Sequence, residues 1–383
     1  MTPSGGPAVM LVAGEASGDL HGAALCHALR RLNPSCRLVG MGGARMAAEG
    51  MDVLVDVTAK AVTGATKAFG QVPRLYRAYR RLREVLEGAD RPAVLVLIDF
   101  PEFNLRLARA ARRARVPVVY FIPPQVWAWR GGRVKTIRER VSLVLAVFPF
   151  EAPLYREAGV PVEFVGHPLL DQLQAAPTRE VARRQLGIDE RTAVVGLLPG
   201  SRHQEVVGVL PAMRDAAAEI LKAAPGTRFV LGLAPTIERA LVAQHLAGGP
   251  LVEVVEGQTH AVIRAADLAL VTSGTVTLEA ALLGTPMIVC YRLSFLSELM
   301  VRMLIRVPWV SLANLTLGRA VVPELYRRTT TGARLAREAL RLLTDDGARE
   351  TQRAAFSELA GQLGEPGVGA RAARLVLAQA GAA

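Results

Sequence analysis

Short apolar runs alternate along the chain with longer stretches in which apolar residues recur every three or four positions. In the first half, five of these runs have the length and composition of buried strands, and four stretches have the apolar stripe of an amphipathic helix. The expected strands are residues 8–13, 93–98, 116–121, 142–147 and 163–165, and the expected helices are residues 19–31, 74–86, 103–115 and 132–141. This alternation predicts a mostly parallel sheet with helices on both faces.

The alternation pauses in a polar segment at residues 172–184 and then starts again. Beyond residue 330 the pattern is helical throughout and rich in alanine, leucine and arginine. In between, strands are expected at residues 193–198, 228–233, 252–255, 268–271 and 287–290, with helices beginning near His203, Thr236, Gln258 and Gly274.

We therefore predict an α/β protein with two doubly wound, Rossmann-like domains that face each other across a cleft. The length of 383 residues agrees with this, because single cores stop growing beyond about 250–300 residues. The expected divisions are a domain at 1–168, a domain at 169–355 and a helical tail at 356–383 that packs back across the domains. Ligand crevices lie at the carboxyl ends of parallel strands, so such a cleft suits a reaction between two substrates.

The basic excess of the chain is concentrated in its first half. Residues 1–166 carry 23 basic and 14 acidic side chains, or +9, and residues 167–383 carry 23 and 20, or +3, which together give the net charge of +12. A positive first half attracts anions such as nucleotide phosphates or acidic lipid headgroups. Nucleic acid is not expected as a partner, because no recognised binding module accompanies the charge.

Other general features point to a cytoplasmic protein. Three cysteines cannot form a closed disulfide framework, which is typical of a reducing compartment, and no stretch near the N-terminus resembles a signal peptide. The longest uncharged apolar run, residues 116–129, contains three prolines and is too short to cross a bilayer of about 30 Å.

The first expected strand runs into the sequence GEASGD, residues 14–19. This turn brings Glu15, Ser17 and Asp19 to the start of a helix, where Ser17 or Asp19 can act as an N-cap. The spacing differs from the G-x-G-x-x-G fingerprint, which argues against a dinucleotide-binding dehydrogenase. A structural turn and a substrate-binding loop both remain open at this point.

Asp99 directly follows the expected strand 93–98 and therefore lies where catalytic groups of parallel sheets are found. A carboxylate there can act as a general base toward a hydroxyl nucleophile, an effect of about 10²- to 10⁴-fold in rate. The sequence Asp99 to Glu102 also resembles a capping box, with Pro101 near the helix start. The spacing alone does not separate these two interpretations.

Three further strand-end loops carry candidate chemistry. The loop PPQVWAWR, residues 123–130, places Trp127 and a second tryptophan where they can form a cleft wall, with ordinary core residues as the commoner alternative. The loop LPGSR, residues 198–202, offers backbone NH groups and a guanidinium to a phosphate, with an N-cap at Ser201 closed by Gln204 as the structural alternative. In TSGT, residues 272–275, a helix start is followed by Glu279, whose carboxylate can accept hydrogen bonds from a ribose diol.

No metal site is predicted from the sequence. The chain contains no H-E-x-x-H, no C-x-x-C and no D-x-D motif. The four residues His21, Cys26, His27 and Cys36 lie close in sequence, but an ordinary helix explains this spacing better than a metal centre.

The segment 69–86 combines five arginines with apolar residues at helical spacing. A solvated helix over a core stripe is the commoner explanation, and a basic amphipathic helix on an anionic membrane surface is the alternative. A second apolar stretch with arginines, residues 293–312, favours the membrane. The arginines are Arg74, Arg77, Arg80, Arg81 and Arg83, and the apolar residues are Phe69, Val72, Leu75, Tyr76, Tyr79 and Leu82.

Together these motifs resemble those of lipid-A-disaccharide synthases, a family of inverting glycosyltransferases with the two-domain GT-B fold. Each matching segment is short, but eight in the same order over about three quarters of the chain make the resemblance specific. From residue 13 to residue 292 they are AGEASGDLHG, GMGGARM, IDFPEFNLRLA, PQVWAWR followed by GRVKTI, FPFEAPLY, FVGHPLLD, LLPGSR and SGTVTLEAALLGTPMIVCYR.

The resemblance implies transfer of a diacylated glucosamine from its UDP-linked donor to the 6-hydroxyl of 2,3-diacylglucosamine 1-phosphate, lipid X. UDP is released, and the product is the β(1→6) disaccharide 1-phosphate that leads to lipid A. Neither a metal nor a cofactor is implied, and a homodimer is compatible with the family. Both substrates carry acyl chains, so the protein is expected to associate peripherally with the inner membrane.

The matching motifs also assign roles to individual residues. Asp99 is the implied base for the acceptor hydroxyl. UDP would be bound by Gly200, Ser201, Arg202, Ser273, Gly274, Thr275, Glu279 and Asn314; the acceptor side would be lined by Glu15, Ser17, Asp19 and Trp127; and the membrane would be touched by Phe69, Val72, Arg74, Leu75, Arg77 and Arg80.

Two alternatives remain at this stage. A UDP-N-acetylglucosamine epimerase of the same architecture would bind UDP alike and need no lipid acceptor. A membrane-associated sugar-nucleotide-binding protein without catalysis would use Asp99 only as a helix cap.

Overall fold

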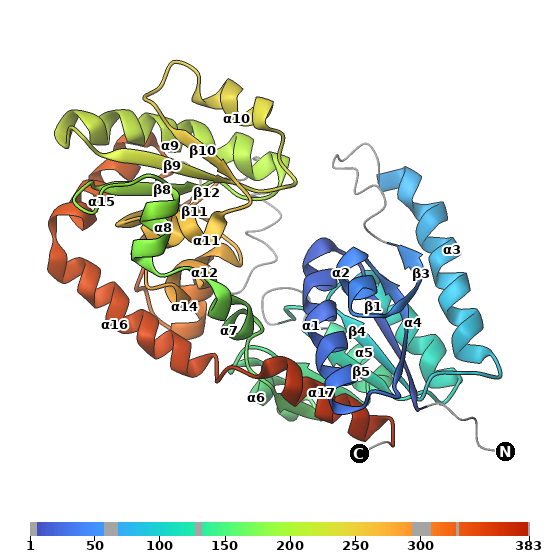
Figure 1. Ribbon diagram of the computed structural model, residues 1–383. Helices are drawn as coiled ribbons and strands as arrows, with labels where there is room; N and C mark the ends of the chain where they lie inside the picture. The colour runs from blue at the N-terminus through green and yellow to red at the C-terminus, as the bar shows by residue number, and fades with distance from the viewer. Residues whose placement is uncertain (1–5, 57–67, 127–131, 293–307, 327–328, 382–383) are drawn as a thin grey trace. The chain divides into compact units, whose positions relative to one another are not determined.

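The computed structural model describes residues 6–56, 68–126, 132–292, 308–326 and 329–381 (Figure 1). The chain divides into two compact units, each built on its own parallel sheet. The first unit consists of Met1–Asp171 together with Leu363–Ala383, and the second of Gln172–Gln362. The first unit is therefore discontinuous in sequence.

The first unit contains a seven-stranded parallel sheet of order β3-β2-β1-β4-β5-β6-β7. The strands are β1 Ala8–Ala13, β2 Arg37–Gly42, β3 Asp52–Asp56, β4 Val94–Ile98, β5 Val118–Phe121, β6 Leu143–Ala146 and β7 Val162–Phe164. The helices are α1 Ala16–Leu32, α2 Ala44–Ala48, α3 Ala68–Glu87, α4 Pro101–Arg113, α5 Arg133–Arg140, α6 Glu151–Glu157, α7 Leu169–Gln172 and α17 Val368–Gln379.

The second unit contains a six-stranded parallel sheet of order β10-β9-β8-β11-β12-β13. Its strands are β8 Val194–Leu198, β9 Arg228–Leu233, β10 Glu253–Glu256, β11 Leu268–Thr272, β12 Met287–Tyr291 and β13 Glu324–Tyr326. Its helices are α8 Arg179–Gln185, α9 His203–Ala223, α10 Arg239–Leu246, α11 Thr259–Ala265, α12 Val276–Leu282, α14 Leu312–Leu317, α15 Gly332–Thr344 and α16 Asp346–Gln362.

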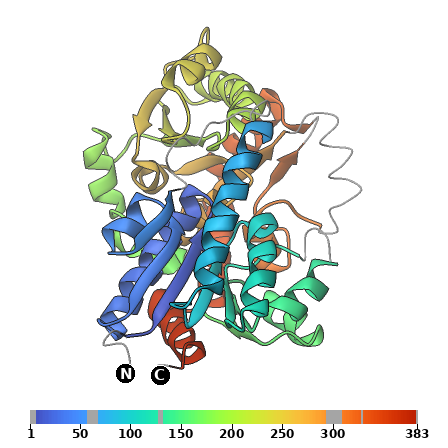
Figure 2. The ribbon, with the colours of Figure 1, turned by 90° about the vertical axis from the view of Figure 1, so that its right-hand side faces the viewer.

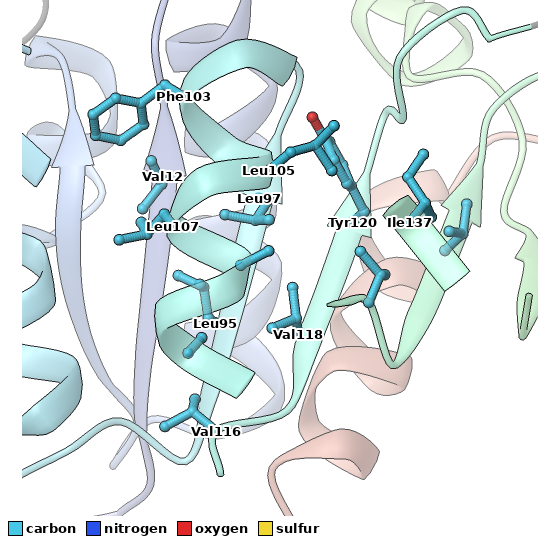
Figure 3. Packing of buried hydrophobic residues seen from close by; sticks show 14 of the residues in the cluster. Val12, Leu95, Leu97, Phe103, Leu105, Leu107, Val116, Val118, Tyr120 and Ile137 are labelled. Carbon is cyan, nitrogen blue, oxygen red and sulfur yellow. The ribbon is translucent and has the colours of Figure 1, made fainter. Parts of the chain in front are cut away.

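Buried strands and the apolar stripes of helices form a separate core in each unit. In the first, side chains of β1, β4 and β5 pack against the inner face of α4, and Figure 3 shows Val12, Leu97, Leu107 and Val118 in this cluster. In the second, the inner faces of α9 and α15 pack on the sheet around residues such as Leu197. The parallel α/β fold predicted from the alternation is confirmed.

Strands β2, β3 and β13 were not expected from the sequence. In β2 the apolar run is interrupted by Gly40 and Gly42, which lowers its strand signal. Gly40 is required there, because its φ is +151° and a Cβ would lie 2.0 Å from the carbonyl oxygen of Leu11. Strand β3 has only three apolar residues between two aspartates, and β13 has only three residues, so neither contains a long apolar run.

The last helix, α17, packs against α1 in the first unit, and Figures 1 and 2 both show the two helices side by side. Ala372 and Val376 of α17 are fully buried. The Asp171 carboxylate accepts hydrogen bonds from Gly367 N at 2.5 Å and Gly369 N at 3.1 Å. Arg371 Nε donates to the Val165 carbonyl oxygen at 3.0 Å, so polar contacts fix both the start and the side of the helix.

Candidate functional site

In the first unit, strands β1 and β4 lie next to each other at the point where the strand order reverses. Ala13 is paired with Ile98, so the loop that begins at Gly14 and the residue Asp99 leave the same edge of the sheet side by side. Ligands of open α/β sheets bind at this kind of switch point, outside the carboxyl ends of the strands. The two sequence motifs of the first half therefore meet at one place.

Asp99 has an unusual backbone that its surroundings hold in place. Asp99 and Phe100 both lie in the left-handed region, with φ of +47° and +46°, at a cost of about 1–2 kcal/mol each. The Asp99 carbonyl oxygen accepts hydrogen bonds from Asn104 Nδ2 at 2.7 Å and from the Tyr120 hydroxyl at 2.8 Å. Helix α4 begins at Pro101 with Phe100 in the N-cap position, so Asp99 stands one residue before the cap.

Gly14 and Phe100 fit together over this site. The Phe100 ring stacks on Phe103 with centroids 5.6 Å apart and covers Gly14 so closely that a Cβ there would lie 2.2 Å from the ring. Only glycine therefore fits at position 14. The contact fixes the turn after β1 against the turn after β4.

The three predicted acceptor-side residues of the first turn differ in their surroundings. Glu15 and Ser17 are exposed, whereas Asp19 is buried. Asp19 Oδ1 accepts hydrogen bonds from Gly43 N at 2.7 Å and Met46 N at 3.1 Å, so its carboxylate caps the start of α2. Helix α1 begins at Ala16 with Glu15 as its N-cap, which shows that the capping interpretation of Ser17 and Asp19 for this helix is wrong. Trp127 lies outside the described residues.

The second unit has the corresponding switch point between β8 and β11. Leu198 is paired with Val271, so the loops that begin at Pro199 and Ser273 also leave one edge of their sheet together. Gly200 has a φ of +114°, and a Cβ there would lie 2.4 Å from Glu205 Oε2. Gly274 has a φ of +152° and open space where a Cβ would stand, which leaves its backbone accessible.

The expectation of free backbone NH groups at Ser201 and Arg202 is wrong. Glu205 Oε2 accepts hydrogen bonds from Ser201 N at 3.1 Å and from Arg202 N at 3.2 Å, and Oε1 pairs with the Arg202 guanidinium at 3.2 Å. The helix cap is thus Arg202 with Glu205, one residue later than the sequence alternative of Ser201 with Gln204. The Arg202 side chain is 75% exposed, so its guanidinium is accessible to an anion.

Glu279 lies within the short helix α12 and is half-buried. Burial raises the pKa of its carboxyl to about 7, above its ordinary value of 4.5. At neutral pH the group is therefore divided between its charged and neutral forms. A ribose diol that donates hydrogen bonds to it would favour the charged form.

Replacement of Glu279 by glutamine is expected to stabilise the protein above pH 7. Because the unfolded chain loses this proton near pH 4.5 and the folded chain near pH 7, the free energy of unfolding of the wild type falls across that interval and then stays constant. The amide removes this loss, so the difference in Tm between Glu279→Gln and wild type should grow from pH 4.5 to pH 8. Thermal unfolding of both proteins at several pH values measures this difference in Tm. Glu219→Gln, on the exposed face of α9, is the control. A Tm difference between Glu279→Gln and wild type that does not depend on pH would contradict the raised pKa of Glu279.

Asn314 is fully buried, and every hydrogen-bonding position of its amide is used within the protein. Nδ2 donates to the Val322 carbonyl oxygen at 3.0 Å and to Glu324 Oε1 at 2.8 Å. Oδ1 accepts from Val321 N at 2.8 Å and Val322 N at 3.0 Å. This bonding makes Asn314 a structural residue of the loop before β13.

Glu324 is the residue that sequence reasoning missed. Besides Asn314, its carboxylate accepts hydrogen bonds from Val310 N at 2.8 Å and Ser311 N at 3.0 Å. The Val310 carbonyl oxygen in turn accepts the hydroxyl of Ser273 at 2.6 Å. Glu324 therefore ties the predicted UDP loop to β13. The sequence shows only an acidic residue between Pro323 and Leu325, and because β13 itself was not expected, this gave no signal for the role.

The predicted membrane residues lie on different faces of α3. Leu75 packs against the core of the first unit, and Arg74 Nη2 donates to the Asp56 carbonyl oxygen at 2.6 Å. The side chain of Phe69 lies outside the described residues. The inner face of this helix is thus committed to the fold.

The outer face of α3, defined here as Val72, Tyr76, Arg77, Arg80 and Arg81, is exposed. Val72 and Tyr76 lie one turn apart and are 61% and 62% exposed. Arg80 and Arg81 lie 3.8 Å and 4.0 Å from Glu84, distances at which exposed ion pairs contribute little. The face thus combines two large exposed apolar side chains with a positive surface.

In the described part of the chain, no group of three or more histidine, cysteine or acidic side chains is arranged to bind a metal ion. Cys26 is fully buried, and burial raises the pKa of its thiol to about 12, which opposes the thiolate form that metals bind. Burial also lowers the pKa of His21 to about 4. Cys26 and Cys36 therefore belong to the interior of the first unit, whereas His27 is exposed and lies 2.9 Å from the Glu49 carboxylate.

A pocket of about 520 Å³ lies at the opposite edge of the first sheet, near the amino ends of β1 and β2. Arg30, Cys36, Arg37 and Asp52 are among its lining residues. It contains none of the residues predicted to bind substrates. We therefore locate the candidate chemistry at the carboxyl ends of the strands and not in this pocket.

Comparison with known proteins gives matches over nearly the whole chain. A family model described as lipid-A-disaccharide synthetase matches residues 9–377. The lipid-A-disaccharide synthase of Myxococcus xanthus (strain DK1622) is 41% identical over 373 residues, which cover 97% of each protein. The lipid-A-disaccharide synthase of Geobacter sulfurreducens (strain ATCC 51573 / DSM 12127 / PCA) is 41% identical over 382 residues, which cover 100% of this chain and 99% of the relative.

Solved structures of lower identity share the fold. A complex of S. aureus MnaA with UDP has a TM-score of 0.68 at 13% identity and covers 99% of this chain and 98% of its own. The UDP-GlcNAc 2-epimerase of Neisseria meningitidis bound to UDP-GlcNAc has a TM-score of 0.62 at 14% identity, with 93% and 99% covered. The calicheamicin glycosyltransferase CalG4 has a TM-score of 0.62 at 17% identity, with 98% of each chain covered. At these identities the likeness shows the fold alone.

Proposed function

This chain belongs to the lipid-A-disaccharide synthase family, and from that premise we propose the reaction and the residues that perform it. It is a glycosyltransferase of lipid A biosynthesis. The proposed donor is UDP-2,3-diacylglucosamine and the proposed acceptor is 2,3-diacylglucosamine 1-phosphate, lipid X. The products are the β(1→6) disaccharide 1-phosphate and UDP. The match of the family over residues 9–377 is the observation that carries this proposal.

Asp99 is the proposed base. Its carboxylate takes the proton of the acceptor 6-hydroxyl while that oxygen forms a bond to the anomeric carbon of the donor. The bond from this carbon to the diphosphate breaks on the opposite side, so the configuration inverts and UDP leaves with the electron pair. The place of Asp99 at the β1/β4 switch point supports this role, and the exposed Glu15 and Ser17 at the start of the neighbouring helix α1 are proposed to bind the acceptor.

The proposed UDP site lies on the loops after β8 and β11. Arg202 offers an exposed guanidinium to the leaving diphosphate, a charge-assisted contact of the kind that arginine makes with phosphates. The open backbone at Gly274, next to Ser273 and Thr275, allows close approach, and Glu279 is proposed to accept the ribose hydroxyls. Gly200, Ser201 and Asn314 support these loops through the contacts described above.

The epimerase alternative has less support than the transferase. Solved structures described as UDP-N-acetylglucosamine 2-epimerases share the fold at only 14–15% identity, whereas the transferase relatives are 41–42% identical over nearly the full length. An epimerase would also turn over UDP-N-acetylglucosamine alone. That difference gives a direct test.

The proposed function is tested by incubating the protein with UDP-2,3-diacylglucosamine and lipid X in detergent and separating the lipids by thin-layer chromatography. Formation of disaccharide 1-phosphate together with an equal amount of UDP is the expected result, and added EDTA should leave the rate unchanged. Turnover of UDP-N-acetylglucosamine without lipid would instead favour the epimerase. Absence of any product would favour a binding protein.

Peripheral binding to an anionic membrane through the outer face of α3 is a further part of the proposal. In the part of the chain that the structure describes, no helix is long and apolar enough to cross a bilayer. Val72 and Tyr76 would enter the interfacial region, while Arg77, Arg80 and Arg81 would face acidic headgroups. The inner membrane is the proposed location, because both proposed substrates carry acyl chains.

A homodimer stays a prediction, which sedimentation velocity tests.

The double variant Val72→Ser/Tyr76→Ser is expected to reduce flotation with vesicles containing anionic phospholipid at least severalfold. The serine side chains insert less apolar surface into the membrane, and each CH₂ group buried there contributes about 0.8 kcal/mol to the free energy of binding. Higher salt should weaken the remaining electrostatic binding further. Leu251→Ser is the matched control, because Leu251 is 92% exposed and belongs to the other unit. Equal flotation of the double variant and the wild type would show that α3 is not the contact.

A further inference from the structure

Tyr120 is a buried tyrosine whose hydroxyl lies beside the proposed base. It lies in β5 next to β4, with Tyr120 paired to Leu97, and its side chain is fully buried. Figure 3 shows its ring within the apolar cluster and its hydroxyl oxygen pointing out of that cluster. The hydroxyl reaches the Asp99 carbonyl oxygen at 2.8 Å, so this buried polar group makes its bond to the one residue assigned as the base.

A second donor converges on the same oxygen from a different element. Asn104 of α4 is also fully buried, and its Nδ2 donates to the Asp99 carbonyl at 2.7 Å and to the Ile98 carbonyl at 3.2 Å. Asp99 is thus held to the neighbouring strand by Tyr120 and to the following helix by Asn104. Helix α4 by itself fixes only Phe100, whose carbonyl accepts the Asn104 backbone N–H at 3.1 Å.

The backbone at Asp99 depends on these bonds. Two consecutive residues other than glycine with positive φ persist only where the surroundings determine them. If one donor is lost, the peptide after Asp99 is less tightly held and can rotate toward a relaxed conformation. Such a rotation turns the direction in which the Asp99 carboxylate leaves the backbone, and a misplacement of about 1 Å can cost about 100-fold in rate.

Tyr120 is chemically suited to be a constant donor. Burial raises the pKa of its hydroxyl well above the ordinary value of 10, and the nearby Asp99 carboxylate raises it further. The hydroxyl therefore keeps its proton throughout the neutral range. It can hold the carbonyl but has no access to solvent, which separates its role from that of an acid or base in the reaction.

We propose that Tyr120 is a positioning residue that sets the orientation of the Asp99 carboxylate by holding the Asp99 carbonyl. The proposal rests on the proposed function, in which Asp99 is the base. Tyr120 touches no substrate and acts through Asp99 alone. Its contribution should therefore disappear when Asp99 can no longer accept a proton.

The test is a double-mutant cycle of Tyr120→Phe and Asp99→Asn in the disaccharide assay. Tyr120→Phe is expected to lower kcat about 10- to 100-fold, with KM for donor and acceptor changed less than about twofold. In the Asp99→Asn background the same change should have no further effect on kcat. Asn104→Ala removes the other donor and should show the same coupling, which keeps the test available if one variant folds poorly.

Tyr155→Phe is the matched control. Tyr155 is fully buried in the same core cluster, and its hydroxyl donates to the Pro124 carbonyl at 3.4 Å rather than to Asp99. It loses the same hydroxyl and should keep kcat within about twofold of the wild type. Thermal unfolding of each variant confirms that the protein is folded at the assay temperature.

Four outcomes would overturn the proposal. Unchanged kcat in Tyr120→Phe would show that the hydroxyl does not position the base. Reductions that multiply in the double variant, or an equal loss in Tyr155→Phe, would show that the effect is general to the core. Full activity of Asp99→Asn would remove the base itself, and absence of disaccharide from the wild type would instead contradict the proposed function.

Discussion

Replacing Asp99 with asparagine is expected to lower kcat about 10²- to 10⁴-fold while the protein remains folded. The amide has the shape of the carboxylate but cannot take the proton of the acceptor hydroxyl. Asparagine also tolerates the left-handed conformation found at this position, so the backbone should not change. KM for both substrates should change little, because the base acts in the transition state.

The rate of disaccharide formation under saturating donor and acceptor measures this effect. Asp90→Asn is a suitable control, because it makes the same change at an exposed carboxylate that follows α3 and should retain wild-type kcat. If Asp99→Asn and Asp90→Asn were equally active, Asp99 would have a structural role. The transferase assignment itself would stand, since it depends on the family.

Replacing Asn314 with alanine is expected to lower the stability of the second unit by about 3–5 kcal/mol. The change removes four hydrogen bonds and leaves the backbone groups of Val321 and Val322, together with part of the Glu324 carboxylate, without their partner. For a unit of this size such a loss corresponds to a decrease in Tm of roughly 10 °C. UDP binding should weaken as a consequence, because Glu324 also holds the loop that Ser273 contacts.

Thermal unfolding and calorimetric titration with UDP separate the two roles of this residue. Asn33→Ala removes an amide whose contacts are local, to Ser35 at the end of α1, and should lower Tm far less. An Asn314→Ala protein with wild-type Tm and no UDP binding would make Asn314 a ligand-binding residue, as the family resemblance implied. A large fall in Tm would make it a residue of the fold.

Most of the fold could be predicted because strands buried on both faces of a parallel sheet have continuous apolar sequences. Strands β1, β4 and β5 lie at the centre of their sheet, are covered on both faces and were expected within one or two residues of their observed bounds. Strands β2, β3 and β13 were missed, since glycines interrupt the first, aspartates flank only three apolar residues in the second, and the third has only three residues. Local pattern thus detects strands whose apolar run is continuous better than strands whose run is short or interrupted.

The site could be predicted in its position but not in its contacts. The rule that ligands bind at the carboxyl ends of parallel strands places Asp99 and Ser273 without any structure. This rule cannot show that the Asp19 carboxylate caps α2, 24 to 27 residues away. Nor can it show that the Asn314 amide forms its hydrogen bonds with the loop before β13. These hydrogen bonds join residues that are not neighbours in sequence, and the pattern of apolar and polar residues gives no sign of them.

The discontinuity of the first unit determines the order in which it can be completed during synthesis. The ribosome makes residues 1–171, then the whole second unit, and only afterwards α17, which covers α1. Until then the surface of α1 that will contact α17, including Ala28 opposite Gly369, stays open to water and to chaperones. A chain cut short before Val368 would therefore lack α17 and leave exposed the part of the protein that was translated first.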